Sequence, residues 1–167
     1  MRKLPMLFAV LALPLAAAAQ IGVSAGFTAA RLNHPVSNVS SPTTLYGTTF
    51  GVYYQKGAVL ALGGDIRANF LGGSGITLNS GAIGPRAAFR FRPLPLQLYG
   101  EALGGFNSYS GSASASSTNQ AEYQLLTGFD TTLLPHIDWR VIEYAYTGAS
   151  NSLSAHALST GIVVRLP

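Results

Sequence analysis

Apolar side chains alternate with small or polar side chains along eight stretches of this sequence. In residues 21–31, for example, Ile21, Val23 and Phe27 share one face, whereas Ser24 and Thr28 lie on the other. A period of two is typical of β-strands whose two faces meet different surroundings, and none of the stretches keeps the 3.6-residue period of a helix. The expected strands are residues 21–31, 44–56, 58–71, 76–91, 96–109, 120–133, 137–147 and 153–166.

The connections between these strands differ in a regular way. The first, third, fifth and seventh are rich in Ser, Asn and Gly and are expected to be long; they are residues 32–42, 72–75, 110–119 and 148–152. The other three are expected to be tight turns. Bacterial outer-membrane barrels have an even number of strands, short periplasmic turns and longer external loops. Since an open sheet edge in lipid would leave backbone groups unpaired, the sequence predicts an all-β, eight-stranded antiparallel up-and-down transmembrane β-barrel.

The first 19 residues have the features of an export signal. Arg2 and Lys3 precede an apolar run over residues 4–16, and small residues at 17–19 offer a cleavage site before Gln20. The run is too short to span a membrane comfortably, and no positively charged cluster follows it. We therefore expect a signal peptide over residues 1–19, which is cleaved, and one barrel domain over residues 20–167. Since the chain contains no cysteine, disulfides and a cysteine-linked lipid anchor are excluded.

Composition favours a surface that faces lipid. Charged residues make up 10% of the sequence, whereas soluble domains usually contain ~25%. No basic stripe suggests a nucleic-acid partner. A soluble exported β-domain, such as a lipocalin-like barrel that binds a small ligand or a sandwich, is the alternative, but apolar faces such as Leu60, Leu62 and Ile66 would then lie exposed.

Eight charged side chains fall on the face opposite the large apolar residues and are expected to point into the lumen. They are Asp65, Arg67, Arg86, Glu101, Glu122, Asp130, Arg140 and Arg165. Nearly balanced charges in an interior just wide enough for side chains predict a structural network of ion pairs. A narrow pathway for ions or small solutes is the alternative. Glu143 lies three residues after Arg140, an odd spacing that would place their side chains on opposite faces of a regular strand (opposite parity). This predicts a β-bulge or a misassigned strand there.

The sequence contains little that indicates a catalytic, metal-binding or nucleotide-binding site. Tyrosines and Trp139 near strand ends fit aromatic belts at membrane interfaces, and Tyr99 is expected inside with a hydrogen bond. Ser154 and His156 would point to the same side, but no acid lies near them to complete a catalytic group. No His, Asp or Glu cluster has metal-ligand spacing, and the glycines of residues 100–105 lack the context of a nucleotide loop. We therefore expect no enzyme activity, catalytic residue, cofactor or metal.

Residues 20–167 resemble the small eight-stranded outer-membrane barrels, of which the OmpA-type transmembrane domain is the best known. The resemblance rests on the strand pattern and, locally, on the segment Asp-Trp-Arg-Val-Ile-Glu-Tyr at residues 138–144, followed by a regularly alternating last strand. The chain ends in Leu166 and Pro167, where members of that class usually end on an aromatic residue that the insertion machinery reads.

This resemblance implies a protein of a Gram-negative-type outer membrane with a structural or surface-interaction role. The partners it implies are outer-membrane lipid, the barrel-assembly machinery and an unidentified ligand of the external loops, with the chain acting as a monomer. Some barrels of this kind modify lipids, so that such an enzyme is a further alternative.

Overall fold

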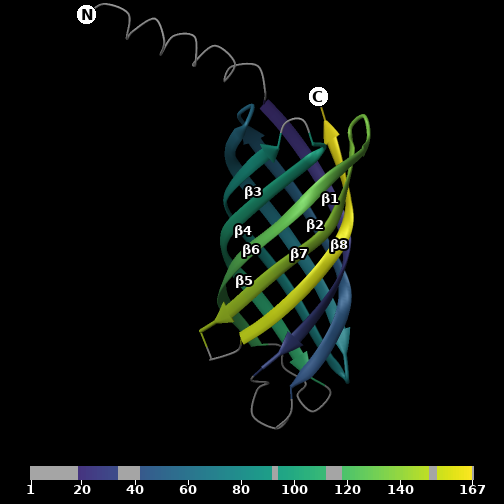
Figure 1. Ribbon diagram of the computed structural model, residues 1–167. Helices are drawn as coiled ribbons and strands as arrows, with labels where there is room; N and C mark the ends of the chain where they lie inside the picture. The colour runs from purple at the N-terminus through teal and green to yellow at the C-terminus, as the bar shows by residue number, and fades with distance from the viewer. Residues whose placement is uncertain (1–18, 34–41, 92–93, 112–117, 151–153, 167) are drawn as a thin grey trace, which may run out of the picture.

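The computed structural model describes residues 19–33, 42–91, 94–111, 118–150 and 154–166. Its strands form one closed antiparallel barrel in chain order, in which the last strand pairs with the first (Figure 1). The strands are β1 (Ala19–Leu32), β2 (Thr43–Lys56), β3 (Leu60–Gly73), β4 (Ile76–Phe91), β5 (Leu96–Gly111), β6 (Thr118–Leu134), β7 (Ile137–Ala149) and β8 (Ser154–Leu166). The predicted eight-stranded barrel is confirmed, and the strand boundaries differ from the predicted ones by a few residues.

The two ends of the barrel are distinct. The start of β1 and the end of β8 lie at the same end, which we call the turn end (Figure 1). The ends of β1, β3, β5 and β7 and the starts of β2, β4, β6 and β8 lie at the other end, which we call the loop end. Residues 1–18 of the expected signal peptide, most of the expected loops at 32–42 and 110–119, and the last two residues of the expected loop at 148–152 lie outside the described residues. Within the described ranges, no helix is long and apolar enough to cross a membrane.

Burial follows the alternation of the sequence. Phe50 and Val52 of β2 point outward and are about half exposed, whereas Tyr53 and Gln55 of the same strand point inward and are buried. The same alternation runs through the other strands, so that large apolar side chains cover the outside. Polar and charged groups fill much of the inside. Because the sheet is closed, every strand pairs with a neighbour on both sides and no edge is left free.

The connection between β3 and β4 corrects one prediction. Residues 72–75 were expected to form one of the long loops, but Gly73 already pairs with Ile76, which leaves a two-residue turn. Ser74 and Gly75 have positive φ angles of 53° and 73°. This is the backbone of a type I′ hairpin turn, whose twist matches that of the strands it joins. The regular alternation of short and long connections therefore fails at this position.

β7 contains the β-bulge that the spacing of Arg140 and Glu143 predicted. Arg140 pairs with Asp130 of β6, whereas Ile142 pairs with Phe129, so that Val141 is an extra residue. The pairing with β8 shifts at the same place. Because a bulge changes the direction of the side chains beyond it, Arg140 and Glu143 both point inward and both are buried.

Gly63 of β3 lies where two strands approach closely. A Cβ atom at this residue would lie 1.8 Å from the carbonyl oxygen of Tyr54 and 2.7 Å from the Cα atom of Gln55, both backbone atoms of β2. We expect Gly63→Ala to lower the free energy of unfolding by about 1–3 kcal/mol, because β2 and β3 must move apart. Urea unfolding in lipid vesicles measures this. Gly81→Ala is the matched control, since no described heavy atom beyond Gly81 and its two chain neighbours lies within 4 Å of its Cβ position. Equal losses for the two variants would contradict the steric explanation.

Candidate functional site: the charged interior

One connected network of ion pairs crosses the interior of the barrel. Its members come from β3 to β7 and are Asp65, Arg67, Arg86, Glu101, Asp130, Arg140 and Glu143. All are buried. Burial of this many charges is costly unless each is paired and hydrogen-bonded, so the contacts within the network decide whether the interior is stable.

Arg67 makes the most ion pairs in the network. Its Nη2 atom lies 3.1 Å from Asp65 Oδ2 and 3.1 Å from Glu101 Oε2. Its Nη1 atom donates to Glu143, which lies on β7, a strand that is not a neighbour of β3 in the sheet. One guanidinium thus connects three carboxylates across the lumen. The planar, five-donor geometry of arginine suits this role better than a lysine would.

The other two arginines complete a ring. Arg86 pairs with Glu101, and its Nη2 atom lies 3.7 Å from Asp130 Oδ2. Arg140 Nε lies 3.1 Å from Asp130 Oδ1, and Arg140 Nη1 lies 3.2 Å from Glu143 Oε2. Since Glu143 and Glu101 both pair with Arg67, acids and bases alternate around a closed circuit. We call this circuit, together with Asp65, the charge ring.

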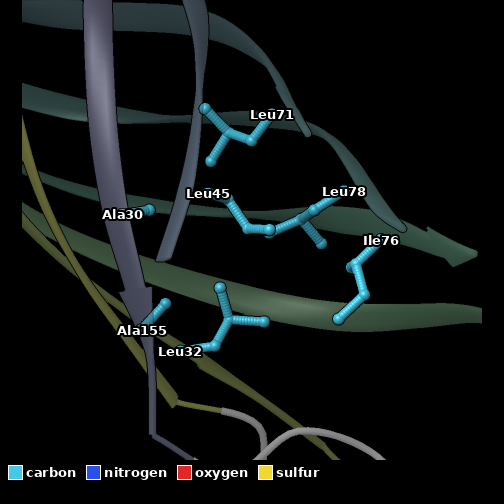
Figure 2. Packing of buried hydrophobic residues seen from close by; sticks show 7 residues of the cluster. All are labelled: Ala30, Leu32, Leu45, Leu71, Ile76, Leu78 and Ala155. Atoms are coloured by element: carbon cyan, nitrogen blue, oxygen red, sulfur yellow. The ribbon is translucent and has the colours of Figure 1, made fainter. Parts of the chain in front are cut away.

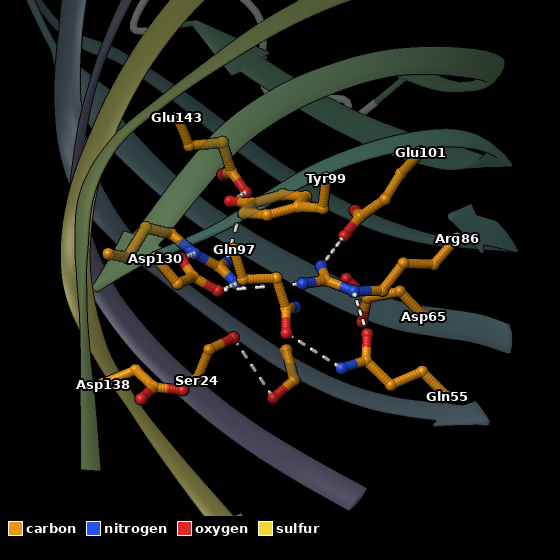
Figure 3. Close-up of polar contacts among 12 residues, drawn as sticks. Ser24, Gln55, Asp65, Arg86, Gln97, Tyr99, Glu101, Asp130, Asp138 and Glu143 are labelled. Atoms are coloured by element: carbon orange, nitrogen blue, oxygen red, sulfur yellow. Dashed lines mark hydrogen bonds and ion pairs between the residues drawn. The ribbon is translucent and has the colours of Figure 1, made fainter. Parts of the chain in front are cut away.

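Tyr99 of β5 is buried against the charge ring, and Figure 3 shows its side chain beside that of Glu143. Its ring centroid is 3.9 Å from the guanidinium carbon of Arg86 and 4.8 Å from that of Arg140. Its hydroxyl group donates to Glu143 Oε2 at 2.6 Å, which confirms the predicted inward, hydrogen-bonded tyrosine. Tyr53 supports the ring in the same way, with its centroid 4.2 Å from Arg86. Both aromatic faces stabilise cations in a site that excludes most water.

Two of the eight predicted lumen charges lie outside the charge ring. Glu122 accepts hydrogen bonds from Asn107 Nδ2 at 3.0 Å and from Gln124 Nε2 at 2.6 Å. Arg165 lies near the turn end, and its Nε atom is 2.9 Å from Asp138 Oδ2. The prediction placed all eight on the inner face, where the structure has them, but they do not form a single network. Asp138 was not among the predicted charges.

Sequence reasoning missed three other inward groups around the ring. Glu143 was recognised only as a residue out of parity, and Tyr53 was grouped with the aromatic residues near strand ends. Gln55, which accepts from Arg86 Nε at 3.3 Å, was not singled out. The signal that could have found Tyr53 and Gln55 is their shared parity, because both alternate with the outward-facing Val52 and Tyr54.

β1 and β8 contribute hydroxyl groups to the interior beside the charge ring. Thr28 Oγ1 lies 2.7 Å from Ser159 Oγ of β8 and 2.6 Å from Thr49 Oγ1 of β2. Thr49 donates to Asn69 Oδ1 at 2.8 Å, and Asn69 donates to Ser80 at 3.0 Å. This chain of hydrogen bonds runs from β8 to β4 on the loop-end side of the charge ring and forms a separate polar layer.

Apolar side chains close the lumen at the loop end (Figure 2). The cluster, which we call the apolar plug, consists of Ala30, Leu32, Leu45, Leu71, Ile76, Leu78 and Ala155. Successive inward residues of β3 show the order of the layers, since Arg67 belongs to the ring, Asn69 to the polar layer and Leu71 to the plug. The expectation of a lumen filled by polar and charged groups is therefore incomplete. The alternation of inward and outward side chains continues into the strand ends, where the inward residues are apolar.

Little open space remains between these layers. A cavity of about 30 Å³ lies between ring and plug, bordered by Thr28, Arg67, Leu78 and Glu143 among others. A second cavity of about 10 Å³ lies beside β1 and β8. A water molecule needs roughly 10–15 Å³ on this scale, so the larger cavity has room for about two waters. At the turn end, a wider opening of about 350 Å³ is bordered by polar groups such as Gln20 and Arg165.

The candidate catalytic pair is not assembled. His156 lies on the outer face, and its Nδ1 atom is 2.6 Å from the hydroxyl oxygen of Tyr144 rather than bonded to Ser154. No acid is available to it, because all six Asp and Glu residues of the chain are buried on the inner face. His136 lies exposed in the β6–β7 turn, and His34 falls outside the described residues. Among the described side chains, no group of three or more could hold a metal ion.

Solved outer-membrane barrels have the same architecture. The attachment invasion locus protein Ail of Yersinia pestis is 16% identical with a TM-score of 0.62, over 88% of this chain and 98% of Ail. Neisserial surface protein A is 19% identical with a TM-score of 0.60, over 86% of this chain and 96% of its own. The N-terminal β-barrel domain of Pseudomonas aeruginosa OprF is 12% identical with a TM-score of 0.56, over 89% and 97%. No protein-family model and no curated protein sequence matches the chain. At these identities the likeness concerns the fold.

Proposed function

We propose that this protein is an outer-membrane β-barrel that does not conduct and that presents the connections of its loop end to the cell exterior. Its role is structural and interactive rather than catalytic. The observation that carries the proposal is the charge ring. A closed circuit of paired charges occupies the interior that a pore or a ligand site would need to keep open.

The outer face supports a lipid environment over a soluble, exported barrel. Large apolar side chains such as Leu62, Ile66 and Phe106 are 58–71% exposed. A soluble monomer rarely exposes contiguous apolar surface of more than a few hundred Å². Trp139 and Tyr54 lie outward near the turn end, as aromatic residues do at membrane interfaces.

The interior supports a closed barrel over a narrow pore. Every arginine of the charge ring pairs with at least two carboxylates, so that a passing ion would have to compete with buried, hydrogen-bonded partners. The apolar plug adds a second barrier of a different kind at the loop end. Dewetted apolar constrictions are known to close pores in membranes.

The proposed role requires specific partners. The chain would be exported by a signal peptide over residues 1–19, inserted by the barrel-assembly machinery and surrounded as a monomer by outer-membrane lipid. A ligand of the loops is the remaining partner, and its identity is open. The crystal structure of Ail of Yersinia pestis in complex with the heparin analogue sucrose octasulfate supports the proposal that a barrel of this architecture can bind a ligand.

Membrane fractions run on a gel without and with boiling test the location. We expect a faster-migrating unheated band in the outer-membrane fraction, because a closed barrel resists detergent until it is heated. The purified protein in a planar lipid bilayer is expected to give no steady conductance. A single unshifted band in the soluble periplasmic fraction would refute the membrane location. Steady channel openings, absent when the boiled protein is added, would refute the closed interior and favour the narrow pore.

A further inference from the structure

The outer face of the barrel carries almost no charge, and the few charges it has are basic. All six acidic residues of the chain point inward. In the part of the chain that the structure describes, Arg31 and Lys56 are the outward-facing Lys and Arg residues, and they lie at opposite ends. Arg31 is the second-last residue of β1, at the loop end, and Lys56 ends β2 at the turn end.

Arg31 lies beside a group of polar aromatic side chains on the same outer face. It is paired across the ladder with His156 of β8, and directly opposite residues on one face have Cβ atoms about 5 Å apart. The His156 ring centroid lies 5.2 Å from that of Tyr146, which lies 6.1 Å from that of Tyr123. The hydroxyl group of Tyr144 forms a hydrogen bond with His156. We call these five residues the rim cluster.

The rim cluster lies at the border of the apolar band. On β1 and β8, the next large outward side chains toward the barrel middle are Phe27, 54% exposed, and Leu158, 52% exposed. Tyr46 of β2 stacks on Phe27, with ring centroids 6.2 Å apart. A polar, cationic group directly above an apolar surface is the arrangement that meets a lipid headgroup above its acyl chains.

Arg31 has no counter-ion among the described residues. It makes no ion pair or hydrogen bond with any described residue, and the outer face offers it no carboxylate. A guanidinium binds phosphate through two parallel hydrogen bonds, and a tyrosine hydroxyl or an imidazole N–H can donate to the same oxygens. When Tyr144 donates to Nδ1 of His156, the neutral ring carries its proton on Nε2, which can then donate to a ligand.

We propose that the rim cluster binds the phosphate group of a lipid in the leaflet at the loop end, with the acyl chains lying against Phe27 and Leu158. This inference rests on the proposed outer-membrane function. Charge complementarity selects an anionic occupant, and the adjoining apolar band selects one that carries acyl chains. Arg31 supplies the charge, and His156 and the tyrosines supply further donors.

Native mass spectrometry of the folded, detergent-solubilised protein tests the proposal, with bis-phosphorylated lipid A as the probe. Arg31→Gln is expected to weaken binding about fivefold, which corresponds to the ~1 kcal/mol contributed by one basic residue near a membrane surface. Lys56→Gln is the matched control, since it removes an outward charge at the other end of the barrel and should leave binding unchanged. Lipid A without phosphate groups should bind the wild-type protein no better than it binds Arg31→Gln.

Three results would overturn the inference. They are equal binding by wild type and Arg31→Gln, equal weakening by Lys56→Gln, and displacement of the lipid by inorganic phosphate at the same concentration. Heat modifiability of each sample is measured in parallel. Samples without a heat-modifiable barrel contradict the proposed function itself, whereas a folded barrel that fails the lipid test contradicts this inference alone.

Discussion

Replacement of Arg67 by alanine is expected to lower the free energy of unfolding in lipid by about 3–5 kcal/mol, the range found when one partner of a buried ion pair is removed. Arg67 pairs with Asp65, Glu101 and Glu143. Its loss leaves three buried carboxylates, of which Glu101 and Glu143 keep one arginine each, whereas Asp65 has no other ion pair with a described residue. The charge ring is then open at one side.

Urea unfolding of the barrel in lipid vesicles measures this loss. Lys56→Ala, which removes an exposed charge, is expected to change stability by no more than about 0.5 kcal/mol. Adding Asp65→Asn to Arg67→Ala should recover part of the loss, because Asp65 is the carboxylate that loses its ion pair when Arg67 is removed. Residues in one network show such non-additivity, whereas independent sites do not. Strictly additive losses, or a stability equal to that of Lys56→Ala, would show that the ring contributes no coupled stabilisation.

The fold could be predicted because each strand of the barrel has one face toward the outside and one toward the interior. The period of two is therefore visible over more than ten residues at a time. The same rule assigned Arg67 and Glu101 to the interior from parity alone. It also predicted either a bulge or a misassigned strand between Arg140 and Glu143, and the structure has the bulge.

The alternation of inward and outward side chains could not predict which inward groups are in contact with one another. Contacts between strands that are not neighbours, such as Arg67 with Glu143, depend on how strongly the strands tilt and stagger when the barrel closes. The shear of a barrel leaves no local signal in the sequence. Glu122 and Arg165 have the same parity as the ring residues, yet their height along the axis places them with other partners.

Strand ends were the other source of error. Leu32 was assigned to a loop, although it continues the inward parity of β1 and is fully buried. Ser74 and Gly75 were assigned to a long loop because their composition is polar and glycine-rich, but that composition equally suits a two-residue turn. Composition alone does not distinguish the two. These errors lie at the loop end, and for that reason the apolar plug was not foreseen.

The apolar plug leads to the second prediction. Leu45 has no exposed surface and packs among leucines of β1, β3 and β4. We expect Leu45→Ala to lower the free energy of unfolding by about 2–5 kcal/mol, because the buried contacts are lost and the surrounding strands cannot collapse fully into the cavity. Leu45→Met, which conserves volume, should cost less than about 1.5 kcal/mol.

Leu62→Ala is the matched control for the plug. Leu62 faces outward with 60% of its surface exposed, so lipid chains can fill the space that its truncation leaves, and the loss should be smaller than for Leu45→Ala. Urea unfolding in lipid vesicles compares the free energies of unfolding of the two variants. Conductance measurements in planar bilayers show whether ions pass through the lumen. Because the charge ring remains intact in Leu45→Ala, this variant should stay closed to ions. Channel openings in this variant would mean that the plug, rather than the ring, is the barrier, and equal losses at the two leucines would mean that the plug is not a packed layer.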